Sequence, residues 1–447
     1  MHNYGYFFIA SHLKPQLELY TDAGITCRIE GFLGGGGQGE VYRGVISGNP
    51  VAVKWYFPEQ ATLVQQSALK NLIQRGAPND KFLWPISIVL NPKIQGFGYV
   101  MPLRDYRFKS IVDLMKRRLE PTFWTLITAG FELADSFFQL HAKGLCYRDM
   151  SFGNAFFDPQ TGEVLICDND NVTINGQDIC GVLGTPRFMA PEVVRGEIQP
   201  CTQTDLYSLS VLLFYLLMVH HPLEGKQEAS IKCFDQPAMN KLYGTNPIFV
   251  FDPQNDSNRP VPGYHDNVLA YWPIYPEFLR KMFVKAFTDG ICDPLNGRVR
   301  ESEWRMALLQ LRDSILYCGH CGAENFYDME QLKQTGSLNP CWSCNMEIKL
   351  PPRIRLGSNI VMLNHNTQLF PHHISLQNPY DFSEPVAEVT RHPTNPNRWG
   401  IKNLSNVTWT TIDQNGILRD VYPGNSIAIT NGIRVQFGTM DGEIRAE

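Results

Sequence analysis

Residues 147–154, which read YRDMSFGN, decide how this sequence folds. They place a carboxylate, Asp149, five residues before an amide, Asn154. A second acidic stretch, DND at residues 168–170, follows the strand-like run VLIC. A single carboxylate of this kind is most often a turn cap or a surface charge. The two stretches therefore indicate a functional site only when they are read together with the segments on either side of them.

A glycine run lies upstream, where residues 33–42 read LGGGGQGEVY between two strand-like segments. Glycines lack Cβ, so their backbone can close over phosphates and point N–H groups at them. Flexible turns have the same composition, but residues 51–55 (VAVKW) then place Lys54 among apolar residues. A buried lysine needs an anionic partner, and polyphosphate is a natural one. No Gly-Lys-Ser/Thr follows the glycines, which excludes a P-loop NTPase.

Two further segments complete an ordered series, namely residues 184–192 (GTPRFMAPE) and 205–209 (DLYSL). In order and spacing, the series resembles the signatures of eukaryotic-type (Hanks-type) protein kinases. The resemblance covers roughly residues 25–317 and implies a bilobal fold that binds ATP. It also implies phosphoryl transfer to protein substrates, with serine or threonine favoured over tyrosine as the acceptor.

The resemblance assigns a role to each residue of the site. Lys54 would hold the α and β phosphates, Asp149 would orient and deprotonate the acceptor hydroxyl, and Asn154 and Asp168 would ligate Mg²⁺ or Mn²⁺. Ser151 joins the catalytic group because it stands where Ser/Thr kinases usually have a lysine. The nucleotide would be enclosed by Gly34, Gly36, Gly39, Val41, Met101 and Leu103.

Several positions depart from the family pattern. Ser151 removes one positive charge from the transferred phosphate. A polar Asn169 cannot pack as the family's Phe does, and we interpret Asp170 as a turn cap, with added metal affinity as the alternative. The helical stretch 58–75 has Gln66 where the family has a glutamate. We therefore expect either a Lys54–Gln66 hydrogen bond or no such pair.

The activation segment, residues 171–184, contains a single hydroxyl residue, Thr173, near its start. We hypothesise that Asp178 pairs with Arg148 in place of a phosphate. By resemblance, Asp205 caps the backbone of the catalytic loop. A buried salt bridge is expected for Arg298 or Arg300.

Two CxxC pairs follow, with 19 residues between them: CGHC at 318–321 and CWSC at 341–344. Each CxxC places two sulfurs on one tight turn, and four thiolates suit a tetrahedral structural zinc. A redox pair is the alternative, although nothing nearby resembles a thioredoxin unit. The predicted Zn²⁺ ligands are Cys318, Cys321, Cys341 and Cys344.

The last helical pattern covers residues 301–317, and beyond residue 352 helical spacing gives way to short strands. Residues 353–442, with WGIKNLSNVTW at 399–409, resemble a forkhead-associated (FHA) domain, a β-sandwich that binds phosphothreonine. The family's Gly-Arg is Gly357-Ser358 here, and its Asn-Gly is Asn406-Val407. We therefore expect a sandwich for protein contacts rather than a phosphothreonine site.

The bulk composition is that of a globular protein of several domains, with 447 residues, 43% of them hydrophobic, and a net charge of −5. This charge argues against nucleic acid as a partner, and no apolar run is long enough to span a membrane. The 11 cysteines fit a reducing cytoplasm. The predicted fold class is α+β, divided into an N-terminal extension (1–24), a kinase domain (25–317, with lobes 25–101 and 104–317), a zinc ribbon (318–348) and an FHA-like sandwich (353–447).

The leading functional hypothesis is an active Ser/Thr protein kinase of bacterial signalling. Its architecture resembles kinases linked to tellurite-resistance systems, which implies a metal-dependent phosphatase and a von Willebrand A protein as partners. Two alternatives stay open: a nucleotide-binding pseudokinase scaffold that recruits partners through its zinc ribbon and β domain, and a kinase fold that acts on a small molecule.

Overall fold

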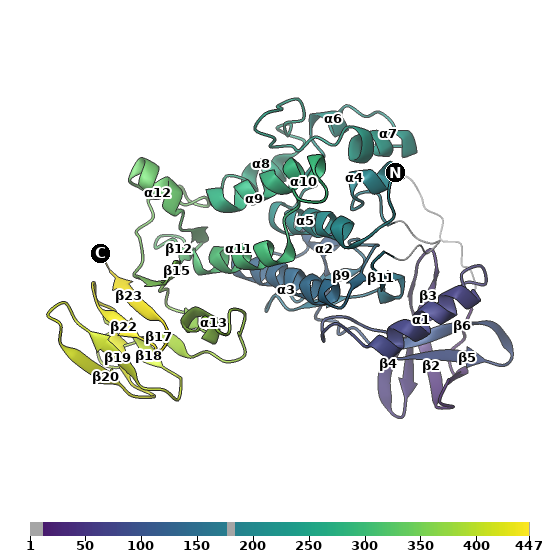
Figure 1. Ribbon diagram of the computed structural model, residues 1–447, viewed down its shortest axis with the longest axis horizontal. Coiled ribbons are helices and arrows are strands. Elements are labelled where there is room, and N and C mark those ends of the chain that lie inside the picture. Colours follow the sequence, from purple (N-terminus) through teal and green to yellow (C-terminus); the bar gives the residue numbers. More distant parts are fainter. Residues whose placement is uncertain (1–11, 177–183, 447) are drawn as a thin grey trace. The chain divides into compact units, whose positions relative to one another are not determined.

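The computed structural model describes residues 12–176 and 184–446 (Figure 1). The chain divides into two compact units. The first contains residues 1–121, 128–269 and 282–305, and the second contains residues 122–127, 270–281 and 306–447. Among the described residues, no helix combines the length and the apolar character needed to cross a bilayer. Asp178 lies outside the described residues, so the proposed pair with Arg148 stays a prediction.

A closed barrel of six antiparallel strands begins the first unit. Its core contains Leu19, Ile29, Val53 and Trp55, which are nearly fully buried. The first strand lies in the segment predicted to be an extension, and it pairs with both its neighbours in the barrel. In barrel order, the strands are β1 (Glu18–Thr21), β2 (Thr26–Gly35), β3 (Gly39–Ile46), β4 (Asn49–Tyr56), β6 (Ile94–Pro102) and β5 (Ser87–Asn91).

Strand β4 lies between β3 and β6, and glycines allow both neighbours to approach it closely. A Cβ added to Gly39 would meet the Trp55 carbonyl oxygen at 2.2 Å, and one added to Gly98 would meet the Lys54 carbonyl oxygen at 2.3 Å. The register places Lys54 directly opposite Tyr99 of β6. Because side chains alternate along a strand, Tyr56 shares the face of Lys54.

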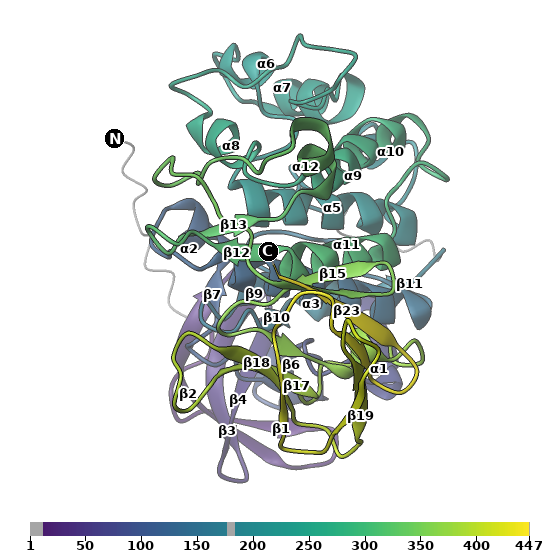
Figure 2. The same ribbon diagram turned by 90° about the vertical axis from the view of Figure 1, so that its left-hand side faces the viewer.

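Helix α1 (Leu63–Arg75) lies beside the barrel and packs against β5 (Figures 1 and 2). It begins five residues later than the predicted start at Pro58, because Thr62 is its N-cap and accepts the N–H of Gln65 at 3.1 Å. It ends at Gly76, whose φ of 70° suits only glycine well.

A larger helical part follows, and its centre is α5, a helix that is buried along almost its whole length. Its elements are β7 (Lys109–Ser110), α2 (Ile111–Met115), α3 (Phe123–Ala142), β8 (Leu145–Cys146), β9 (Ala155–Phe157), β10 (Val164–Ile166), η1 (Asn169–Asn171), β11 (Thr173–Ile174), α4 (Pro191–Val194), α5 (Thr202–Met218), α6 (Lys226–Ala229), α7 (Gln236–Asn240), the π-helix η2 (Lys241–Thr245), α8 (Asp266–Tyr271), α9 (Glu277–Phe287), α10 (Asp289–Cys292) and α11 (Glu301–Asp313).

In the second unit, the first CxxC pair follows the first strand of a hairpin, and a short helix follows the second. The predicted helix from Glu301 to Tyr317 is wrong in its last turn, because the chain leaves the helix at Asp313 and enters this hairpin. The elements are β12 (Ile315–Tyr317), β13 (Glu324–Phe326) and α12 (Met329–Thr335).

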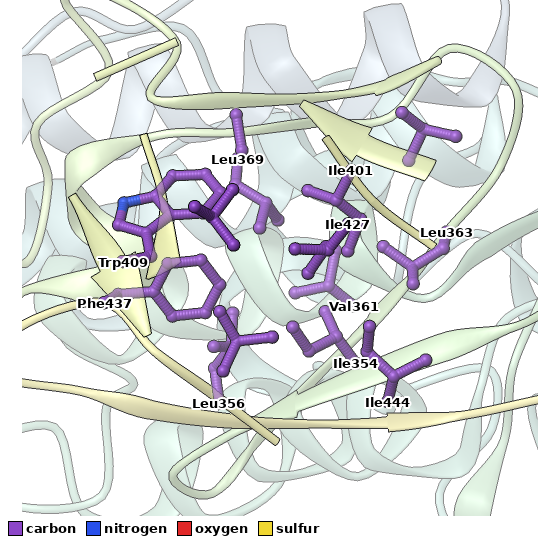
Figure 3. Close-up of a cluster of buried hydrophobic side chains, with 14 residues drawn as sticks. Ile354, Leu356, Val361, Leu363, Leu369, Ile401, Trp409, Ile427, Phe437 and Ile444 are labelled. Carbon is purple, nitrogen blue, oxygen red and sulfur yellow. The ribbon is translucent and has the colours of Figure 1, made fainter. Parts of the chain in front are cut away.

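Two antiparallel sheets follow and share one cluster of buried side chains (Figure 3). Trp409 and Ile354 come from the six-stranded sheet, whereas Ile401 and Ile427 come from the four-stranded one. The first sheet contains β15 (Asn359–Met362), β14 (Arg353–Leu356), β23 (Asp441–Arg445), β22 (Arg434–Gln436), β19 (Trp409–Ile412) and β20 (Leu418–Val421). The second contains β16 (Gln368–Leu369), β17 (Ala387–Arg391), β18 (Trp399–Asn403) and β21 (Ser426–Ala428), and α13 (Pro371–Ile374) follows β16.

Candidate active site

The loop at residues 147–154 is held in place from the buried helix α5. Asp205 accepts the backbone N–H of Tyr147 at 2.5 Å and that of Arg148 at 3.0 Å. Arg148 has a φ of 73°, a conformation that costs energy in a non-glycine residue and needs such support. The capping role that the resemblance implied for Asp205 is therefore present in the structure.

Hydrogen bonds join the two predicted metal ligands to this loop. Asn154 donates from its side-chain amide to the Asp149 carbonyl at 2.7 Å, and its own carbonyl accepts the N–H of Cys167 at 2.8 Å. The amide oxygen of Asn154 is thereby the atom left for another ligand, and Asp168 follows Cys167 directly. The loop and the 168–170 stretch are thus one connected site.

Asp149 contacts the segment at residues 184–192. Its carboxylate accepts the hydroxyl of Thr185 at 3.0 Å. Burial raises the pKa of Asp149 above its ordinary value, although the hydrogen bond from Thr185 opposes this. A carboxylate with a raised pKa is better suited to accept a proton than an ordinary surface aspartate.

Lys54 lies at the centre of the site with its side chain only 6% exposed. Its ammonium group donates to Asp168 at 2.5 Å, to Asp170 at 2.9 Å and to Gln38 at 3.0 Å. Burial alone would lower the pKa of Lys54, but the carboxylates of Asp170 and Asp168 raise it, so the lysine stays charged. Burial and the charge of Asp170 raise the pKa of Asp168 to about 6.

Asp170 is fully buried and accepts the hydroxyls of Tyr56 at 2.5 Å and Tyr99 at 3.1 Å. The interpretation as a turn cap is therefore wrong, because its carboxylate is bound by side chains of the barrel and not by nearby backbone. Asn169 is also buried and donates to the carbonyls of Leu83 and Ile166 at 3.0 and 2.9 Å.

Gln66, which the sequence placed opposite Lys54, does not play that part. Among the described residues, its side chain makes no hydrogen bond to Lys54 in the structure. Its neighbour Gln65 points to the site instead, donating to the Tyr56 hydroxyl at 3.2 Å and to the Asp170 carbonyl at 3.3 Å.

The predicted nucleotide residues form two groups. Val41, Met101 and Leu103 pack in a single apolar cluster, which suits the flat face of a base. A Cβ added to Gly34 or Gly36 would meet nothing within 4 Å, so the space beside these two glycines is open. Gly39 has a structural reason to be glycine as well, because it lies against β4.

Ser151 lies in the same loop and is half-buried. Its carbonyl accepts the N–H of Asn154 at 3.2 Å, which helps to close the loop. Sequence reasoning missed Gln38, Tyr56 and Tyr99. The signal for the tyrosines was their place on two adjacent strands on the Lys54 face.

The four cysteines of the second unit form a compact cluster, with all four sulfurs within 4.8 Å of one another. Cys318 and Cys344 lie 3.7 Å apart at sulfur, and Cys321 and Cys341 lie 3.6 Å apart. Tetrahedral Zn–S bonds of about 2.3 Å imply sulfurs about 3.8 Å apart, so the spacing fits zinc.

The two CxxC turns have the same backbone geometry. Each first cysteine accepts, through its carbonyl, an N–H from four residues on at 2.8 Å: Gly322 for Cys318 and Asn345 for Cys341. Both of these residues have positive φ, at 76° and 58°. Burial alone would raise the pKa of Cys341. Hydrogen bonds from the Cys344 N–H and other donors instead lower this pKa to about 6, which favours a thiolate.

Comparison with known proteins identifies part of this structure. Residues 108–270 match the family model described as "Protein kinase domain". The match does not include the barrel with Lys54, so the geometry above supplies independent support for that half of the site.

Individual relatives are serine/threonine kinases by name. The chain is 30% identical over 119 residues to the probable serine/threonine-protein kinase CCRP1 of Zea mays, covering 26% of this chain and 19% of that protein. It is 30% identical over 206 residues to the serine/threonine-protein kinase PknK of Mycobacterium tuberculosis, covering 43% and 18%. The chain thus spans about a fifth of the length of these relatives. Together with the family match, these names show that the chain is similar to serine/threonine-protein kinases.

Proposed function

We propose that this protein is an ATP- and magnesium-dependent protein kinase that transfers the γ-phosphate to serine or threonine in protein substrates. The observation that carries the proposal is the meeting of Lys54 with Asp168 at 2.5 Å, beside the Asp149–Asn154 loop. Lys54 comes from the barrel, whereas Asp149, Asn154 and Asp168 come from the helical part. A phosphate bound between these two parts would therefore contact residues of each.

The donor set fits the expected ligands. Lys54 would hold the α and β phosphates, and the oxygens of Asp168 and Asn154 are of the kind that Mg²⁺ prefers. Phosphoryl transfer needs positioning and charge neutralisation more than covalent catalysis. Asp149, half-buried and hydrogen-bonded to Thr185, would orient the acceptor hydroxyl and take its proton.

The decisive experiment is transfer of labelled γ-phosphate from Mg-ATP to the protein itself and to a generic protein acceptor. Asp149→Asn should abolish transfer, whereas Asp113→Asn, a change on the exposed side of α2, should not. Label on serine or threonine that vanishes only in the first variant would support the proposal. Equal transfer by both variants would refute the assignment of Asp149.

One alternative is a nucleotide-binding scaffold that does not transfer phosphate. Ser151 favours it, because the loop lacks the lysine that usually contacts the moving phosphate. Mg-ATP that raises the melting temperature of the protein without any transfer would establish the scaffold. The buried anchor of Lys54 at Asp170 argues for the active enzyme.

The cysteine cluster is proposed to hold a structural Zn²⁺ through Cys318, Cys321, Cys341 and Cys344. Four thiolates would fill a tetrahedral site and leave no open position, so the metal would stabilise and not catalyse. Metal analysis should find one zinc per chain, and Cys341→Ser should lose it. A Cys341→Ser protein with unchanged zinc content and melting temperature would refute the site.

The two sheets at residues 353–446 are proposed to be an FHA-like β-sandwich used for protein contacts. Gly357 turns between β14 and β15 with a φ of 59°, and Ser358 replaces the arginine of the family beside it. Peptide binding would test this: tighter binding of a phosphothreonine peptide than of its unphosphorylated form would overturn the expectation. A bacterial signalling role in the cytoplasm, with a phosphatase and a von Willebrand A protein as partners, belongs to the same proposal.

A further inference from the structure

Lys54 is anchored by a residue that the family pattern does not use for that purpose. In active protein kinases the lysine pairs with a glutamate on the helix that follows it. That helix is α1 here, and Leu63–Arg75 contains no acidic residue. Lys54 nevertheless contacts both carboxylate oxygens of Asp170, at 2.9 and 3.0 Å, with the two side chains 6% and 0% exposed.

The barrel is built to hold this carboxylate. Tyr99 is the cross-strand partner of Lys54, and Tyr56 lies two residues along β4 on the same face. Their hydroxyls both donate to Asp170, so Lys54, Tyr56 and Tyr99 converge on one group. An ionised carboxylate without exposure to water needs such donors, and these three provide a charge-assisted network.

These contacts also decide against Asp170 as a metal ligand. Both of its oxygens are bound by Lys54 and the tyrosines, and its side chain has no exposed surface. Asp168, by contrast, is 32% exposed and can reach a ligand in the site.

We propose that Asp170 is the positioning residue that holds Lys54 for phosphoryl transfer, in place of the glutamate of the family. It lies two residues after Asp168, so one short segment carries both the lysine anchor and a metal ligand. The ion pair itself therefore includes no residue of α1, which touches the network through the hydrogen bonds of Gln65 to the Tyr56 hydroxyl and the Asp170 carbonyl. This inference rests on the proposed kinase activity.

The test measures kcat and KM for ATP in Asp170→Asn, which removes the charge and keeps a hydrogen-bond acceptor for the tyrosines. Loss of a charge-assisted contact should lower kcat by about 10- to 100-fold. Binding of a fluorescent ATP analogue should change by less than about 3-fold, because the base and metal contacts remain. Gln66→Ala, on α1, is the matched control and should keep the wild-type kcat.

The outcomes distinguish a wrong assignment of Asp170 from a wrong proposal of kinase activity. If wild type and Asp170→Asn transfer phosphate equally, or if Gln66→Ala loses as much activity, the assignment of Asp170 is overturned while the kinase proposal stands. If wild type binds the analogue but transfers nothing, both fail together. Should Asp170→Asn not fold, Tyr99→Phe weakens the same anchor. A smaller fall of kcat at unchanged melting temperature would support the proposal, and an unchanged kcat would overturn it.

Discussion

His141 at the end of α3 should make the stability of the first unit depend on pH in a predictable way. Its Nε2 lies 3.1 Å from Asp205, and its Nδ1 contacts Glu301. A neutral imidazole has only one N–H, so it cannot donate to both carboxylates at once. Burial alone would lower the pKa of His141, but the hydrogen bonds that its ring donates to both carboxylates raise it to about 9.

The magnitude follows from proton linkage. An unfolded histidine has a pKa of about 6.5, so the folded state holds its proton about 2.5 pH units longer. At 1.36 kcal/mol per unit, this contributes about 3 kcal/mol to the free energy of unfolding. The contribution is complete below about pH 6.5, declines as the pH rises from about 6.5 to about 9, and is gone above about pH 9.

The pKa can be measured directly from the imidazole NMR signals, with His141→Gln used to assign the resonance. Urea unfolding of both proteins should then show the wild type losing about 3 kcal/mol relative to the variant between pH 6.5 and 9. His392→Gln, a change at an exposed histidine, is the control and should follow the wild type. A resonance that titrates below pH 7, or a difference between the two proteins that stays constant with pH, would refute the reasoning.

Two core substitutions give further expected outcomes. Glu192→Ala removes the carboxylate that lies 2.5 Å from Arg298, whose side chain is only 2% exposed. This change should lower the free energy of urea unfolding by about 3–5 kcal/mol. A loss below about 1 kcal/mol would show that the pair is not buried as described. Trp409→Ala removes the largest side chain of the cluster in Figure 3 and should destabilise the second unit by about 3–5 kcal/mol, whereas Leu418→Ala, at a residue that is 64% exposed, should change its unfolding little. Equal effects of the last two changes in thermal unfolding would contradict the packing.

The central site could be predicted from the sequence because its chemistry is carried by short motifs. Asp149, Asn154 and Asp168 lie within 20 residues of one another, and backbone contacts join them: the Asn154 amide donates to the Asp149 carbonyl, and the Asn154 carbonyl accepts the N–H of Cys167 next to Asp168. A buried salt bridge was expected for Arg298 or Arg300, and the structure places it at Arg298, which pairs with Glu192.

The partner of Lys54 could not be found in that way. Asp170 is separated from it by 116 residues, and only the register of β4 and β6 shows that Tyr56 and Tyr99 point to the same place. The helical pattern of α1 instead suggested Gln66, because sequence spacing gives the face of a helix but not its rotation against a barrel. The end of α11 was missed because the hairpin before the cysteines, and not helix propensity, stops it at Asp313.

The charges of the site lead to one more consequence. Among the described residues, Lys54 pairs with Asp168 and Asp170 and also acts electrostatically on Asp149, and Ser151 adds no positive charge where the family has a lysine. A polyphosphate would enter a site that is already negative, so its binding must depend on metal ions more strongly than in kinases that keep that lysine. The ion pair with Asp170 increases this dependence, because Lys54 is already paired with a carboxylate of the protein before any phosphate binds. We therefore expect nucleotide affinity to fall steeply when Mg²⁺ is removed, and an affinity for ATP that is unchanged in excess chelator would contradict this account of the charges.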